Sequence, residues 1–149
     1  MHRSKQLGAT LLEIMLVLAI ASMVVVMSIR YYQAANSSQQ ANAFLSQVSA
    51  VNAAAESLFA GGDLSQVNTT NIAALLGGAS KLNTPGGGTI TIASSSNSFI
   101  GTATLISGSV CSAVKAQLSA NARITAAAST GCASANASAA FSWTYDFSK

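Results

Sequence analysis

The sequence predicts an α+β protein in which a long N-terminal helix packs its second half on a small antiparallel sheet. Three observations lead to this prediction. No glycine or proline interrupts residues 9–60. Residues 9–29 are apolar and contain one charged residue, Glu13. Beyond residue 60, glycine-rich turns separate short segments whose alternating apolar and polar residues are typical of β-strands.

Length and composition exclude several classes of protein. The chain has 149 residues, half of them hydrophobic, and 7% are charged, whereas a soluble domain has about a quarter. This length suits one domain with an anchor and excludes a multi-domain enzyme. The net charge is +3, but without Arg3 and Lys5 of the leader the balance is five Lys/Arg against four Asp/Glu, or +1, which leaves no basic patch for nucleic acid. The single histidine is His2, so the rest of the chain lacks the commonest general base and metal ligand. We expect no catalytic residue, no metal and no cofactor.

The first half of the helix is long enough to cross a membrane. Residues 9–29 span about 31 Å, the thickness of one hydrocarbon core. Arg30, Tyr31 and Tyr32 follow as a possible interfacial anchor. The leader carries Arg3 and Lys5, which favours a cytoplasmic N-terminus and an exported remainder. The run is too long for an ordinary secretory signal peptide, so we expect a retained helix.

The second half of the helix is amphipathic. Apolar residues recur at spacings of three and four, at Phe44, Val48, Val51, Ala55 and Leu58. We expect one helix over residues 9–60. The alternative is two helices broken near residues 36–38.

The remainder, residues 61–149, predicts a small head of helices and strands. A short helix is expected over 71–76, capped by Thr70 or Asn71 and ended by Gly77. A turn follows at 85–88, then strands at 89–92 and 98–106, a helix over 109–120 capped by Ser109, and a weak strand at 123–126. The strongest strand signal is the alternating aromatic set Phe141, Trp143, Tyr145 and Phe147, which we expect to face the amphipathic half of the helix.

Two cysteines, Cys111 and Cys132, lie in the exported part of the chain. An even number of cysteines in a small exported domain favours a disulfide. Other motifs carry little weight. Ser112 and Lys115 fit S-x-x-K by chance, and the sequons at Asn68 and Asn136 are common in so polar a chain. The exported acids Glu56, Asp63 and Asp146 are too scattered to predict a calcium site.

Glu13 is the most informative residue because a charge inside a membrane span costs about 2.5–3.5 kcal/mol and needs a partner. One interpretation is local, because Thr10 and Glu13 match the capping box S/T-x-x-E. Another is that cleavage after Gly8 gives Ala9 a free amine, which pairs with the carboxylate of Glu13 within a chain or between neighbouring chains.

The segment Gly8-Ala9-Thr10-Leu11-Leu12-Glu13, after a short basic leader and before an apolar helix, resembles the signature of type IV prepilins. Tyr31-Tyr32-Gln33, the turn at 83–87 and the late cysteine pair are similar to the type IVb branch, which includes bundle-forming and toxin-coregulated pilins. The chain departs from the family at Ala9, where Phe, Met or Leu is more frequent, and its leader and head are short for type IVb.

The resemblance implies a three-part chain, with a leader at 1–8, a long helix at 9–60 whose residues 9–29 span the membrane or fill a filament core, and a head at 61–149. It implies cleavage between Gly8 and Ala9 and N-methylation of Ala9. It also implies that Glu13 attracts the Ala9 amine of the preceding subunit. A Cys111–Cys132 disulfide would bound a variable region, 111–132.

The resemblance also implies partners and a location. The chain would be a structural subunit without enzymatic activity, polymerised into a surface pilus for adhesion, aggregation, motility, conjugation or DNA uptake. Its partners would be copies of itself, a prepilin peptidase and N-methyltransferase, an assembly platform and minor pilins. It would lie in a bacterial inner membrane with a periplasmic head before assembly, and in an extracellular pilus afterwards. The alternatives are a type II secretion pseudopilin and a monomeric, single-pass membrane-anchored binding protein.

Overall fold

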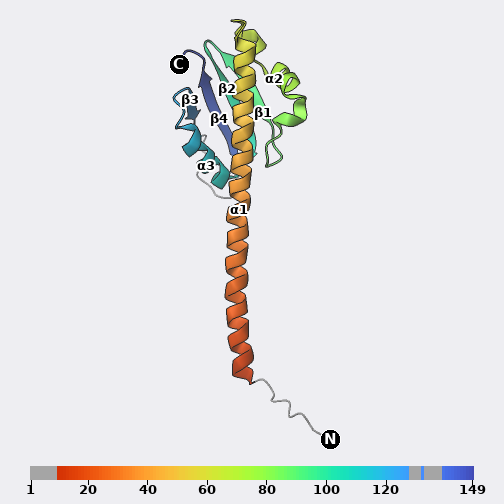
Figure 1. Cartoon of the computed structure of the whole chain (residues 1–149), viewed down its shortest axis with the longest axis vertical. Helices are drawn as coiled ribbons and strands as arrows, with labels where there is room; N and C mark the ends of the chain where they lie inside the picture. The colour runs from red at the N-terminus through yellow and green to blue at the C-terminus, as the bar shows by residue number, and fades with distance from the viewer. Residues whose placement is uncertain (1–9, 128–131, 133–138) are drawn as a thin grey trace. The chain divides into compact units, whose positions relative to one another are not determined.

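The computed structural model describes residues 10–127, 132 and 139–149 (Figure 1). The described elements, in chain order, are α1 (Leu11–Phe59), the 3-10 turn η1 (Leu64–Gln66), α2 (Thr69–Leu76), the 3-10 turn η2 (Ala79–Leu82), β1 (Ile90–Ser95), β2 (Ser98–Ile106), α3 (Gly108–Leu118), β3 (Ile124–Ala127) and β4 (Ala139–Asp146). The predicted α+β layout, with a long apolar N-terminal helix and a small antiparallel sheet, is confirmed.

Helix α1 is continuous through residues 36–38, so the alternative of two helices is wrong. The chain nevertheless forms two compact units, one up to Asn36 and one from Ser37 to Lys149. The first unit holds the apolar half of α1, and nearly every described side chain in it is exposed. The second unit, called the head below, holds the amphipathic half of α1 and all other described elements.

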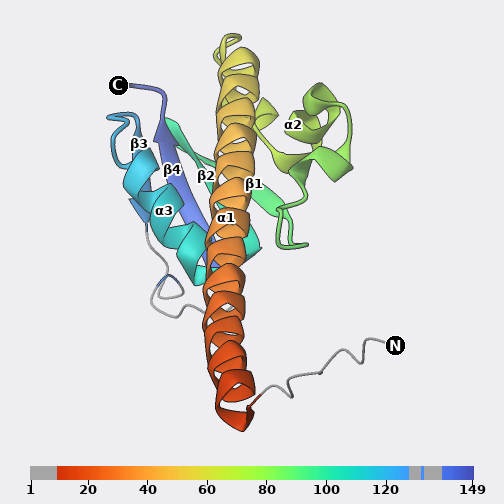
Figure 2. The same ribbon diagram turned by 60° about the horizontal axis from the view of Figure 1, so that its bottom comes forward.

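The sheet of the head has the strand order β1-β2-β4-β3, and all its pairs are antiparallel. Strand β4, the last in the sequence, therefore lies between β2 and β3. The second half of α1 covers one face of the sheet, α2 lies beside β1, and α3 lies beside β3 (Figure 2). The outer edge of β1 is capped at Ile92, whose N–H donates to the hydroxyl of Thr69 at 2.8 Å.

The core lies between α1 and the aromatic face of β4, as the sequence predicts. Phe44 of α1 meets Phe141 and Trp143 edge-to-face, at ring-centroid distances of 6.1 and 6.2 Å. The indole N–H of Trp143 donates to the Oδ1 of Asn52 at 3.3 Å, which satisfies two polar groups buried beneath the helix. Phe147 follows the end of β4 and stacks on Phe59 at 4.3 Å.

One glycine in the sheet is required by packing. Gly101 of β2 is the register partner of Trp143 on β4. A Cβ atom at Gly101 would overlap the indole ring of Trp143. Trp143, the largest fully buried side chain of the head, therefore packs directly against the backbone of Gly101.

The element boundaries differ from the predictions where side-chain caps decide them. Helix α2 begins at Thr69 because Asn68, not Thr70 or Asn71, caps it, and its Oδ1 accepts from the N–H of Asn71 at 2.9 Å. Gly77 ends that helix in the left-handed region, with φ 95°, as predicted. Helix α3 begins at Gly108, with Ser107 instead of Ser109 at the capping position.

Strand β1 is longer than predicted. It runs to Ser95, which pairs with Ser98, so that β1 and β2 form a hairpin with the two-residue loop Ser96–Asn97. Ser96 has φ 41°, the left-handed conformation that such loops need. A serine-rich stretch without glycine gave no turn signal at this position.

Candidate assembly site

Glu13 lies in the first turn of α1. The N–H groups of Glu13 and Ile14 donate to the backbone carbonyl of Thr10 at 2.9 and 3.2 Å. A capping box needs the Thr10 hydroxyl on the N–H of Glu13 and the Glu13 carboxylate on the N–H of Thr10. Neither bond is present among the described residues, so the carboxylate has no partner within the part of the chain that the structure covers.

The surroundings of Glu13 are apolar and exposed. Ile14, Val17 and Leu18 border it in a shallow groove of about 250 Å³ and are exposed by 50, 58 and 62%. The same exposure continues along α1 as far as Ile29. An apolar surface of this extent marks a site of contact with a membrane or with another protein.

Helix α1 is long and apolar enough to cross a membrane, by length and composition. At the end of its apolar stretch Tyr31 and Tyr32 are highly exposed, as an interfacial anchor requires. The predicted cleavage residues, Gly8 and Ala9, lie outside the described residues. Their cleavage and methylation therefore stay predictions.

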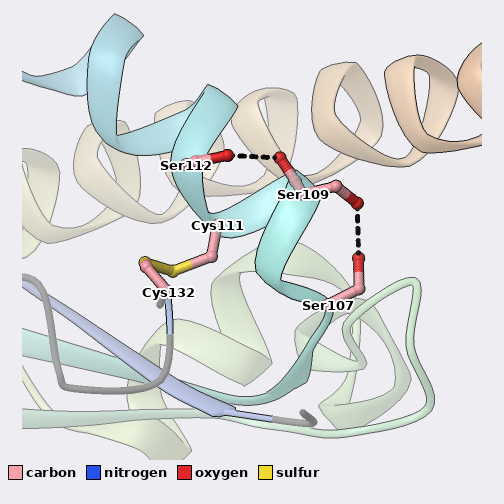
Figure 3. Close-up of a disulfide and its surroundings, with 5 residues drawn as sticks. All are labelled: Ser107, Ser109, Cys111, Ser112 and Cys132. Atoms are coloured by element: carbon pink, nitrogen blue, oxygen red, sulfur yellow. Dashed lines mark hydrogen bonds between the residues drawn. A yellow bond between two sulfur atoms is a disulfide. The ribbon is translucent and has the colours of Figure 1, made fainter. Parts of the chain in front are cut away.

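The predicted disulfide between Cys111 and Cys132 is confirmed, with a Cα–Cα distance of 5.4 Å (Figure 3). Cys111 lies on the buried face of α3 and Cys132 is partly buried. The bond therefore ties α3 to the chain segment that leads into β4. Ser112, on the exposed face of α3, donates its hydroxyl to the carbonyl of Ser109 at 2.9 Å, and we assign no chemistry to the S-x-x-K match.

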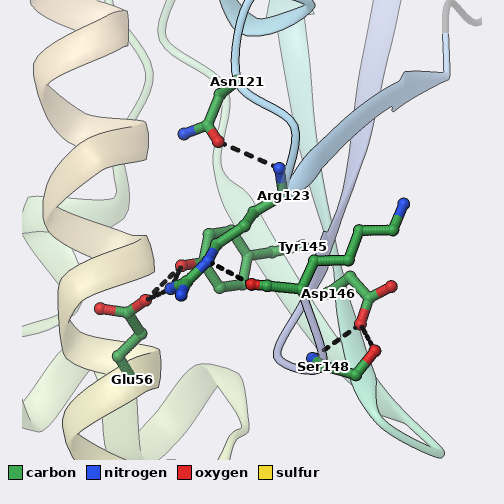
Figure 4. Close-up of polar contacts among 7 residues, drawn as sticks. Glu56, Asn121, Arg123, Tyr145, Asp146 and Ser148 are labelled. Carbon is green, nitrogen blue, oxygen red and sulfur yellow. Dashed lines mark hydrogen bonds and ion pairs between the residues drawn. The ribbon is translucent and has the colours of Figure 1, made fainter.

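The head contains a polar cluster that the sequence did not reveal (Figure 4). Arg123 Nη1 lies 2.9 Å from the Oε1 of Glu56, and its Nε donates to the carbonyl of Lys149 at 2.9 Å. The hydroxyl of Tyr145 also donates to Glu56. The three side chains come from α1, the turn just before β3, and β4. The sequence separation between Glu56 and Arg123 leaves no local pattern by which the pair could have been found.

The Tyr145 hydroxyl is the group in this cluster whose pKa is shifted mainly by burial. Burial raises the pKa of the Tyr145 hydroxyl, and the hydrogen bond to Glu56 raises it further. The hydrogen bond between Arg123 and Tyr145 raises the pKa of the guanidinium. Tyr145 is buried, whereas the side chains of Arg123 and Glu56 are 49% and 46% exposed, so their ion pair is screened by water. We interpret the cluster as a polar contact that joins α1 to the sheet.

The other acids of the head have local structural roles. Asp63 caps η1 by accepting from the N–H of Ser65 at 2.9 Å, and Asp146 accepts from the N–H of Ser148 at 2.9 Å. Hydrogen bonds from the side chains of Ser65 and Ser148, and then from these N–H groups, lower the pKa of the Asp63 and Asp146 carboxyl groups. Within the described residues no three potential metal ligands cluster together. Asn68, the first sequon residue, uses its side chain as the cap of α2.

The structure therefore brings Cys111 and Cys132 together, and it places Glu13 on the exposed apolar stretch of α1. Comparison with known proteins adds no assignment, because no known family model, curated protein or solved structure matches this chain.

Proposed function

We propose that this chain is the precursor of a type IV pilin, a subunit that is cleaved between Gly8 and Ala9, held in the inner membrane and polymerised into a surface pilus. The observation that carries the proposal is the exposed apolar half of α1 with its one acid, Glu13, which has no partner among the residues that the structure describes. Such a surface needs a covering of lipid or of protein. A pilin uses both, first as a membrane-held monomer and then in the filament.

Glu13 has a defined role in this function. Lipid and a bundle of apolar helices are similar environments, so burial alone gives little drive to leave the membrane. A carboxylate without a partner is costly in either environment. Cleavage after Gly8 would provide the amine of Ala9 at the same end of the helix. Pairing of that amine with the Glu13 of a neighbour would select one axial register.

Such a pairing joins two different surfaces of identical chains. A contact of this kind leaves both of its surfaces free at the two ends of any pair, and where its rotation does not close a ring, its repetition builds an open helical filament. The Cys111–Cys132 disulfide supports the same function from the head. A small head with few large apolar side chains needs the additional constraint to stay folded in the extracellular medium.

The experiment that tests the proposal compares cells with and without this gene by electron microscopy, using an antibody against the head. We expect thin labelled filaments, and sequencing of the purified subunit should give an N-terminus at Ala9. A subunit confined to the membrane fraction, or one that still begins at Met1, would contradict the pilin proposal. The first result would favour the membrane-anchored monomer. Short labelled structures that depend on a secretion apparatus would favour the pseudopilin.

A further inference from the structure

Leu105 has an unusual backbone conformation near the end of β2. Its φ angle is 55°, in the left-handed region that leucine rarely adopts. The register between β2 and β4 shifts between Ala103 and Ile106, so Leu105 lies in a bulge of the strand. Its side chain is 45% exposed. A bulky apolar side chain is therefore held out of the sheet at a cost in backbone strain.

The loop 84–88 fixes this conformation. The buried Thr84 donates its hydroxyl to the carbonyl of Thr104 at 3.0 Å and accepts from the N–H of Gly88 at 2.9 Å. Gly86 lies so close to the Leu105 carbonyl that a Cβ atom there would overlap it. The bulge is thus held by backbone contacts, which any residue tolerant of positive φ would satisfy. The leucine side chain is not needed for them.

The same head has an apolar groove between α2, η2 and β1. The groove has a volume of about 760 Å³, which exceeds the volume of one side chain. Small or apolar residues line much of it, including Ala73, Ala74, Gly78, Ala79, Leu82 and Ile90, and its lining holds no charged residue. Leu105 is not part of that lining, so the protruding leucine does not fill the groove of its own chain.

On the adjacent edge of β1, the hydroxyl of Thr69 accepts a hydrogen bond from the N–H of Ile92 at 2.8 Å and donates one to the carbonyl of Ile92 at 3.2 Å. The isolated bridge between Asn83 and Thr89 covers the start of the same edge. An added β-strand would find these positions taken. The groove therefore suits an apolar side chain better than an extended peptide.

We propose that Leu105 of one subunit inserts into this groove on the head of the next subunit. The inference rests on the proposed filament and identifies a contact between its heads. A protruding apolar residue that fits a groove elsewhere on an identical chain makes a contact that does not close, which is the geometry of an open polymer. It also accounts for a strained leucine that the fold itself does not require.

The first test is Leu105→Asn in the full-length chain. Asparagine tolerates the left-handed conformation, so the melting temperature of the head should not fall, while the apolar contact is lost. We expect about tenfold less subunit in sheared filaments, with the remainder in the membrane. The control is Ile100→Thr, which removes a similarly exposed residue, 39%, from a regular part of the same strand and should leave filament yield unchanged. Equal filament yields for Leu105→Asn and wild type would overturn the inference.

The second test detects the contact directly and does not depend on the loss of filaments. Two variants, Leu105→Cys and Ala74→Cys, are expressed together, so that only a bond between chains can join the two positions. We expect a disulfide-linked heterodimer in oxidised filaments, and none when Ile100→Cys replaces Leu105→Cys. Filaments without the heterodimer would overturn the inference and leave the pilin proposal standing. Wild-type cells without filaments would overturn the pilin proposal and this inference with it.

Discussion

The two halves of α1 both carry apolar side chains, but only the second half buries them within its own chain. Residues 37–59 bury an apolar stripe, centred on Phe44, Val48 and Val51, against the sheet of their own chain. Residues 11–29 are more apolar, yet none of their side chains is covered. The comparison teaches that one helix serves two kinds of packing. The second half stabilises the monomer, and the first half leaves its apolar side chains exposed for contact with a membrane or with other chains.

Each half also carries one acid. Glu56 in the second half has partners from its own chain, Arg123 and Tyr145. Glu13 in the first half has none among the described residues. Substitutions at matched positions in the two halves can therefore separate assembly from folding.

The largest expected effect follows from Glu13→Ala. Removing the carboxylate relieves the cost of a charge in lipid, so the subunit should insert, be cleaved and fold normally. The Ala9 amine of a neighbour would then be desolvated without a partner, at several kcal/mol per subunit. We expect filaments to be lost while the melting temperature of the head is unchanged, as measured by electron microscopy and by calorimetry in detergent.

The matched control is Glu56→Ala. It breaks the half-exposed ion pair with Arg123 and removes the acceptor of the Tyr145 hydroxyl, so head stability should fall by about 1–2 kcal/mol while filaments should persist. If Glu13→Ala gave filaments of normal number and length, the exposed acid would have no role in assembly. The two halves would then differ only in the exposure of their apolar side chains, and not in the role of their acids.

The second prediction concerns the disulfide, which acts on the head only. Replacing Cys111 and Cys132 by serine opens a loop with a sequence separation of 21 residues. The expected loss of unfolding free energy is about 3 kcal/mol. Because Cys111 is fully buried, a hydroxyl at this position adds a further penalty. Calorimetry of the full chain in detergent, with and without reductant, measures the loss, and membrane insertion of the first half should be unaffected.

Much of this fold could be predicted from residue patterns, because those patterns express local physics. The absence of helix breakers predicted α1, and the alternation of four aromatics predicted β4 and its contact with the helix. The disulfide was predicted from two cysteines in a domain that we expect to be exported. The ends of α2 and β1 were misplaced. Asn68 caps α2 in competition with Thr70 and Asn71, and the hairpin after β1 uses a positive φ angle at Ser96, which serine rarely adopts.

The remaining features could not be predicted because they join distant residues. The Glu56 and Arg123 pair, the Asn52 and Trp143 hydrogen bond and the bulge at Leu105 depend on the strand order β1-β2-β4-β3. No spacing in the sequence specifies that order. The candidate assembly residue Glu13 was found for the opposite reason, since a single charge in an apolar helix is visible in the sequence itself.

The third prediction tests the packing that keeps the second half in place. Gly101→Ala puts a methyl group into the indole ring of Trp143, and the ring cannot shift without losing its contacts with Phe44 and Asn52. We expect a loss of about 1–3 kcal/mol in head stability. Gly61→Ala is the control, because a Cβ atom there meets only the Leu58 carbonyl at 4.0 Å. Equal melting temperatures for the two variants would show that the head tolerates the methyl group by rearrangement.

The smallest expected effect concerns pH. Because burial and the hydrogen bond to Glu56 raise the pKa of Tyr145 in the folded head, the folded state holds the phenolic proton more tightly than the unfolded state. This contribution to stability is fully present below the pKa of an unfolded tyrosine, about 10, and is lost as the pH rises through the higher value of the folded state. Denaturant unfolding should therefore show a fall in stability that begins near this pH.

Tyr145→Phe isolates that contribution. The variant loses the hydroxyl bond to Glu56, worth about 1 kcal/mol at neutral pH, and the stability difference between wild type and variant should narrow on going to alkaline pH. Tyr31→Phe, in the exposed half of α1, should keep the wild-type profile because the Tyr31 side chain is 80% exposed. A stability difference for Tyr145→Phe that stayed constant with pH would mean that the hydroxyl ionises equally in both states. The Tyr145 hydroxyl would then contribute to head stability without making that stability depend on pH.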